Sequence, residues 1–117
     1  MNSLLGYEKQ ERPWGNFERL TLNELSTVKV ITVSPLGKLS LQRHAHREEV
    51  WRVLSGEGVV TIDASVIKAK SGDIFVIPVG STHRLEASDE GIVILEIARG
   101  EFDENDIERI EDVYGRI

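Results

Sequence analysis

Short runs of apolar and β-branched residues, separated by turns that contain glycine or proline, recur along most of this 117-residue chain. Turn signals interrupt these runs roughly every 8–12 residues, a rhythm typical of a β-sandwich or a β-barrel. A chain that turns so often has little room for long helices, so we expect an all-β fold. The runs that predict strands are residues 28–33, 39–46, 50–54, 59–63, 66–70, 74–77 and 92–97.

Length and composition narrow the class of protein. A chain of 13.1 kDa with 40% hydrophobic and 29% charged residues fits one globular domain. The absence of cysteine excludes disulfides and thiolate metal sites. A net charge of −6 argues against a nucleic-acid partner. We expect neither a secretory leader nor a membrane span, since the sequence shows no basic segment followed by a long apolar run. We expect a cytoplasmic domain over residues 1–117: an N-terminal arm at 1–11, a barrel at 12–100 and a tail at 101–117.

The tail differs from the rest of the chain. Ile107, Ile110 and Val113 follow helical spacing, and acidic residues precede them where a helix dipole favours negative charge. We therefore expect a short C-terminal helical segment.

The chain holds only three histidines, and each has a possible partner for metal chemistry. His44 and His46 are two residues apart, so they lie on the same face of one predicted strand. Glu49 follows shortly after, and His83 comes just after another strand. Because neighbouring strands of a small barrel turn alternate side chains inward, these groups can converge on one point. Imidazoles with a carboxylate suit a divalent transition metal, whether Zn, Mn, Fe, Co or Ni.

The spacing around these residues resembles that of the cupin family, whose fold is a small jelly-roll barrel also described as a double-stranded β-helix. Its second motif matches Gly72, Pro78-Val79-Gly80 and His83, and the second half of its first motif matches Glu49 and Gly56. The resemblance implies a cupin barrel with a metal site that contains His44, Glu49 and His83. Counting back from Glu49, the family spacing adds Gln42 as the fourth ligand; a shorter loop before Glu49 would instead add His46.

Four segments are similar to the type II mannose-6-phosphate isomerases: residues 12–18, 39–51, 78–86 and 106–116. This resemblance implies aldose–ketose isomerisation of a sugar phosphate through a metal-stabilised cis-enediol. In that family the domain usually follows a mannose-1-phosphate guanylyltransferase, which could here be a separate partner. A related string in the type I isomerases, in which the Gln and the His are both zinc ligands, favours Gln42.

Isomerisation also needs proton transfer and phosphate binding. Glu48 and an unligated His46 are candidate bases. Arg47 and Arg84 follow His46 and His83 directly and are candidate phosphate ligands, and we place Arg84 among the catalytic candidates as well. Trp51 shares the strand parity of Glu49, so it either stacks on the sugar or belongs to the core or a dimer interface.

Four positions depart from the isomerase pattern: Ala45, Glu48, Val50 and Ala87. They favour an alternative in which the chain is a metal-containing cupin that binds a small sugar or metabolite without turnover. Another metal-dependent reaction, such as oxygen activation, is a third hypothesis. Because a small barrel leaves strand edges to protect, we also expect a homodimer with the arm at residues 12–22 in the interface.

Overall fold

The computed structural model describes residues 6–116, and within them the chain forms nine β-strands and no helix. Accordingly, this part of the chain contains no helix long and apolar enough to cross a membrane. The strands are β1 (Glu8–Arg12), β2 (Gly15–Arg19), β3 (Ser26–Val33), β4 (Leu41–Arg43), β5 (Glu48–Ile62), β6 (Ser65–Lys70), β7 (Ile74–Ile77), β8 (His83–Arg99) and β9 (Glu108–Glu111).

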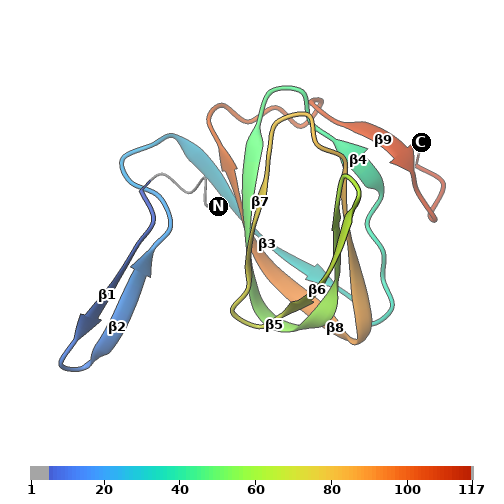
Figure 1. The fold of residues 1–117 in the computed structure, drawn as a ribbon. Helices are drawn as coiled ribbons and strands as arrows, with labels where there is room; N and C mark the ends of the chain where they lie inside the picture. Colours follow the sequence, from blue (N-terminus) through green and yellow to red (C-terminus); the bar gives the residue numbers. More distant parts are fainter. Residues whose placement is uncertain (1–5, 117) are drawn as a thin grey trace.

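The barrel is built around two long strands, β5 and β8, which pair antiparallel with each other (Figure 1). The first half of β5 also pairs with β7, and its second half with β6. In the same way, β8 pairs with β4 at its start and with β3 over its second half. Each long strand therefore takes part in both walls of the barrel, and the bends within them close it.

The bend depends on glycines that let the two long strands approach each other closely. Register shifts interrupt the β5–β8 pairing near Gly56 and Gly58. A Cβ atom at Gly56 would lie 2.2 Å from the carbonyl oxygen of Gly91, and one at Gly58 would lie 2.1 Å from that of Glu86. Gly56 also has a positive φ of 81°, which L side chains rarely adopt. The motif glycine Gly56 is thus required by both backbone conformation and space.

The core fills the barrel with inward-facing residues of the strands. Side chains one residue apart point to opposite faces, so β5 buries Trp51 and Val53 inside, and β8 buries Ile92 and Ile94. The core cluster consists of Val33, Trp51, Val53, Val60, Ala69, Phe75, Ile77, Leu85, Ile92 and Ile94.

The expected all-β barrel is confirmed, with three differences from the predicted elements. Runs 50–54 and 59–63 are halves of one strand, β5, because the glycines bend it without ending it. The expected C-terminal helix is wrong: a turn leads into β9, which pairs with β4. Ile110 and Val113 are exposed, so the helical spacing does not mark a buried face.

The third difference is at the N-terminus, where the expected arm is a β-hairpin. Strands β1 and β2 pair with each other and stand away from the barrel (Figure 1). Trp14, at the turn of the hairpin, is 72% exposed. At the base of the hairpin, Glu18 forms an ion pair with Arg52 of β5. Residues 1–5 of the predicted arm lie outside the described residues.

We predict that Gly56→Ala destabilises the fold far more than Gly80→Ala. The two glycines have nearly equal φ angles, +81° and +82°, so both substitutions carry the same backbone strain of about 1–2 kcal/mol. Only Gly56 faces a backbone oxygen, whereas no atom lies within 4 Å of a Cβ at Gly80. Chemical denaturation of both variants measures the difference in the free energy of unfolding. Equal losses would contradict this account of the bend.

Candidate metal centre

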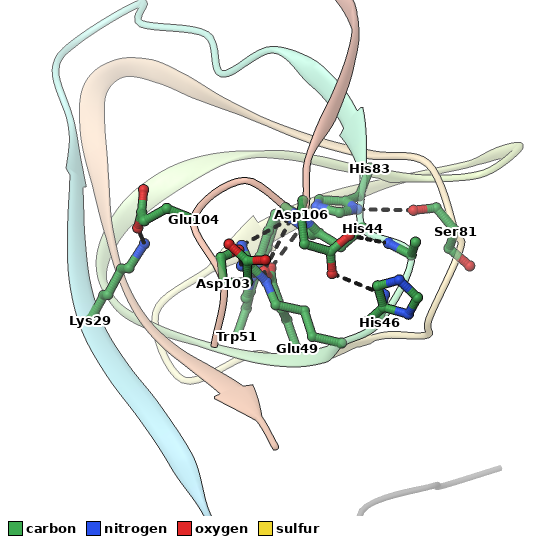
Figure 2. A network of polar contacts seen from close by, with 12 residues as sticks. Lys29, His44, His46, Glu49, Trp51, Ser81, His83, Asp103, Glu104 and Asp106 are labelled. Carbon is green, nitrogen blue, oxygen red and sulfur yellow. Dashed lines mark hydrogen bonds and ion pairs between the residues drawn. The ribbon is translucent and has the colours of Figure 1, made fainter. Parts of the chain in front are cut away.

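Three buried side chains meet inside one end of the barrel: His44, Glu49 and His83 (Figure 2). One potential ligand atom from each lies within 4.8 Å of the others, and these residues form a group that could hold a metal ion. The Nε2 atom of His44 lies 3.2 Å from Oε2 of Glu49, and Nε2 of His83 lies 3.9 Å from Oε1. The two imidazole rings are 5.1 Å apart between centroids.

The three residues come from neighbouring strands, as their spacing in the sequence predicts. His44 follows β4, Glu49 lies near the start of β5, and His83 begins β8. The amide of Gly80, in the turn before His83, donates a hydrogen bond of 2.9 Å to the carbonyl of His44. This bond ties the two motif segments together.

Backbone carbonyls orient both histidines through Nδ1. The carbonyl of Asp106 lies 2.5 Å from Nδ1 of His44, and the carbonyl of Ser81 lies 3.0 Å from Nδ1 of His83 (Figure 2). A carbonyl only accepts, so each Nδ1 carries a proton and each ring turns its Nε2 towards Glu49. Second-shell hydrogen bonds of this kind fix the tautomer and the orientation of metal-ligating histidines.

Glu49 is a fully buried carboxylate, only 1% exposed, whose charge is balanced by its neighbours. Trp51 Nε1 donates to Oε1 at 3.0 Å, and Arg47 Nε donates to Oε2 at 2.9 Å. Burial raises the pKa of Glu49, but attraction by His44, His83 and Arg47 outweighs burial and holds the pKa below its usual value. The carboxylate is therefore ionised and available as an anionic ligand.

His83 provides a separate test of whether the site fits a metal ion. Burial lowers its pKa, which keeps the imidazole neutral. Its Nε2 atom is buried and has no hydrogen-bond partner within residues 6–116. An orphaned buried nitrogen is costly unless something binds it. A cation held by His83, His44 and Glu49 would satisfy this atom, and two imidazoles with one carboxylate suit a divalent transition metal.

The two candidates for the fourth ligand lie in different places. Gln42 is the cross-strand partner of His83, which puts both side chains on the same face of the sheet. His46 is exposed, and its ring points away from Glu49 (Figure 2). Gln42 is thus paired with His83 across β4 and β8, whereas His46 is not part of the group formed by His44, Glu49 and His83.

The other predicted site residues fall into two groups: two are turned away from the site, and two contact Glu49. Glu48 points away from Glu49 and forms an ion pair of 2.8 Å with Arg99. Arg84 points away from His83 and pairs with Glu111 at 2.9 Å. Arg47 and Trp51 instead contact Glu49 within the site.

Two residues of the site escaped the sequence analysis. Glu96 of β8 is buried; burial, and then the charge of Glu49, raise its pKa to about 7. A carboxyl inside the apolar run 92–97 was the signal for it. Asp106 binds the amides of Ala45 and His46 through its carboxylate, in addition to its carbonyl contact with His44. No local pattern marked Asp106, because its partners lie about sixty residues away.

The barrel and its His/Glu/His group define a cupin-type domain. Its fold resembles a double-stranded β-helix protein of unknown function from Klebsiella pneumoniae, with a TM-score of 0.64, 24% identity and 78% of each chain covered. The sequence profile of one family, described as "Mannose-6-phosphate isomerase C-terminal", matches residues 3–112. The chain belongs to this family.

Two relatives illustrate the wider similarity. The alginate biosynthesis protein AlgA of Pseudomonas putida is 43% identical over 107 residues, and the mannose-1-phosphate guanylyltransferase ManC of Salmonella typhimurium is 39% identical over 108. These matches cover 90% and 91% of this chain but only 22% of each relative.

We predict that His44→Gln, Glu49→Gln and His83→Gln each weaken metal binding by roughly 100-fold or more, because losing a direct ligand costs at least as much as losing a second-shell partner. His46→Gln is the matched control and should bind metal like the wild type. Titration calorimetry with Co²⁺ measures the affinities. A loss in His46→Gln as large as that in His83→Gln would place His46 in the metal set, and a loss in Gln42→Ala would place Gln42 there.

Proposed function

We propose that this domain is a metal-dependent isomerase of a sugar phosphate, with mannose 6-phosphate as the first substrate to test. The observation that carries the proposal is the preorganised group of His44, Glu49 and His83, in a chain of the mannose-6-phosphate isomerase C-terminal family. These residues, with Gln42 as the proposed fourth ligand, would hold the metal. A bound divalent metal supplies Lewis-acid stabilisation of the negative charge that develops on sugar oxygens.

The chain's own residues prepare the site for such a reaction. Trp51 donates a hydrogen bond to Oε1 of Glu49 and so orients the carboxylate. Of the two predicted bases, His46 is exposed and accessible, whereas Glu48 is paired with Arg99 on the outer side. We therefore retain His46 as the candidate for proton transfer. Arg47 is the better candidate for phosphate binding, since Arg84 is engaged with Glu111.

The same site supports a second candidate function, a metal-containing cupin that binds a sugar or metabolite without turnover. The engagement of Glu48 and Arg84 in ion pairs favours it, because two of the groups expected to act on the substrate are turned away.

The proposal extends to partners and location. The ManC relative carries the name of a guanylyltransferase and is much longer than this chain. We propose that a guanylyltransferase unit, on the same or a separate chain, works with this domain in the cytoplasm.

We predict that the protein loaded with Zn²⁺, Mn²⁺ or Co²⁺ interconverts mannose 6-phosphate and its ketose isomer, and that removal of the metal abolishes turnover. NMR of the sugar signals follows the reaction. His83→Ala should be inactive, whereas Lys68→Ala, a change of an exposed residue on β6, should retain activity. Absence of turnover with metal demonstrably bound would overturn the isomerase and leave the binding function.

We further propose that the chain forms a homodimer through the outer face of the sheet that contains β3. Val28 and Val30 of β3 point outward and are largely exposed, next to Leu95 of β8. The hairpin formed by β1 and β2 stands off on its own, and an isolated two-stranded hairpin is marginally stable in water. A second copy that covers this face and contacts Trp14 would bury both features.

The dimer predicts a solution mass of twice 13.1 kDa. Val30→Glu should lower the mass to that of one chain, because it places a charge in the apolar interface. Val66→Glu on β6 is the control, since Val66 is also an exposed strand valine, 71% against 61% for Val30. Light scattering after size exclusion measures the masses. A wild-type mass near 13.1 kDa would rule the dimer out.

A further inference from the structure

The guanidinium of Arg47 binds the atoms that a metal ion would need. Its Nε donates to Oε2 of Glu49 at 2.9 Å, and its Nη2 lies 3.3 Å from Nε2 of His44. Since Nδ1 of His44 carries the ring proton, Nε2 accepts this hydrogen bond with its lone pair. Arg47 is thus the positive partner of the buried Glu49 carboxylate and also contacts the imidazole of His44.

One nitrogen lone pair cannot serve two partners. Nε2 of His44 has a single lone pair, so it binds either the guanidinium or a metal ion. A divalent cation close to Arg47 would also repel it. Metal binding by His44 therefore requires the guanidinium to leave at least this contact.

The remaining contacts of Arg47 indicate where its guanidinium would lie after it leaves His44. Its Nη1 donates to the carbonyl of Asp103 at 3.3 Å, and its guanidinium lies over the ring of Phe102 at 4.5 Å. Both residues belong to the segment between β8 and β9, which contains Asp106 and so adjoins the group at His44. A guanidinium held there keeps a planar fork of donors that suits phosphate.

We propose that Arg47 and the metal ion exchange places on His44 and Glu49, so that metal loading releases a guanidinium to bind a phosphate group of the ligand. The inference rests on the proposed function for its ligand class, a phosphate monoester. The exchange also implies an order of binding. The metal binds first, and the phosphate group binds to the guanidinium that the metal has released.

The first test is metal affinity. In Arg47→Met the competing guanidinium is lost while the unbranched stem of the side chain is kept, so Mn²⁺ should bind roughly tenfold more tightly, the equivalent of one hydrogen bond to a charged group. The metal-free variant should melt at a lower temperature than the wild type, because Glu49 loses a partner. Arg52→Met removes the ion pair of Arg52 with Glu18 on the outer face of β5 and should leave Mn²⁺ affinity unchanged. Equal or weaker Mn²⁺ binding by Arg47→Met would overturn the exchange.

A second measurement uses the wild type and does not depend on the variant folding. The Nε–H signal of Arg47, assigned by triple-resonance NMR, should be protected from solvent exchange in the metal-free protein. Addition of Zn²⁺, which is diamagnetic, should shift this signal and remove its protection. A signal that stays protected and unshifted with Zn²⁺ bound would show that the guanidinium does not move.

The third test concerns the anion and uses inorganic phosphate as the probe. Phosphate should bind the Zn²⁺-loaded wild type several-fold more tightly than the Zn²⁺-loaded Arg47→Lys variant, which keeps the charge but lacks the planar fork. Equal affinities would overturn the phosphate role of Arg47. None of these readouts requires turnover, so a chain that shows the exchange but no isomerisation would contradict only the proposed reaction.

Discussion

A buried carboxylate is the constraint around which this site is built. Glu49 lies inside an apolar barrel, where an unpaired charge would shift its pKa or destabilise the fold. His44, His83, Arg47 and Trp51 compensate it, and each is held in turn by the backbone or by a packed strand. The closing segment between β8 and β9 belongs to the same arrangement, because it supplies the carbonyls that orient His44 and receive Arg47. The fold thus determines the site, because the bend of β5 and β8 brings together the strands that carry His44, Glu49 and His83.

The parts of the fold that follow from local pattern were predictable, and those that depend on distant contacts were not. Alternation and turn residues predicted the strands, and the spacing of His44, Glu49 and His83 predicted their convergence in a barrel. The continuity of β5 was not predictable, because Gly56 and Gly58 could either end a strand or bend it, and only the pairing with β8 decides which. The C-terminal tail was wrongly predicted as a helix for a similar reason. Three apolar residues at helical spacing gave weak evidence, and the pairing of β9 with β4 overrode it.

The outer face of the barrel is unusually apolar along β8 and β3. Antiparallel sheets that face water usually alternate apolar and polar residues, yet the run 92–97 of β8 is apolar at every position except Glu96. Its inward residues form the core, and its outward residues continue the apolar surface of Val28 and Val30 on β3. A sheet that is apolar on both faces is typical of a structure covered on both sides. Ile97 of this outer face is already buried within the chain, so the surface left for a second copy is centred on Val28 and Val30 of β3.

Strand parity also decides what the four departures from the isomerase pattern mean. Glu48 and Val50 flank Glu49 on β5, so both point to the outer side, where Glu48 pairs with Arg99 and Val50 is buried. Ala45 is exposed in the loop before β5. Ala87 of β8 packs against the core and is the cross-strand partner of Gly58 on β5. None of these four side chains belongs to the group of His44, Glu49 and His83. An extra carboxylate inside the site would repel a sugar phosphate, but a carboxylate neutralised on the outer face does not. The departures thus change the surroundings of the site and leave its ligand group unaltered, which removes the main argument from sequence against a phosphorylated ligand.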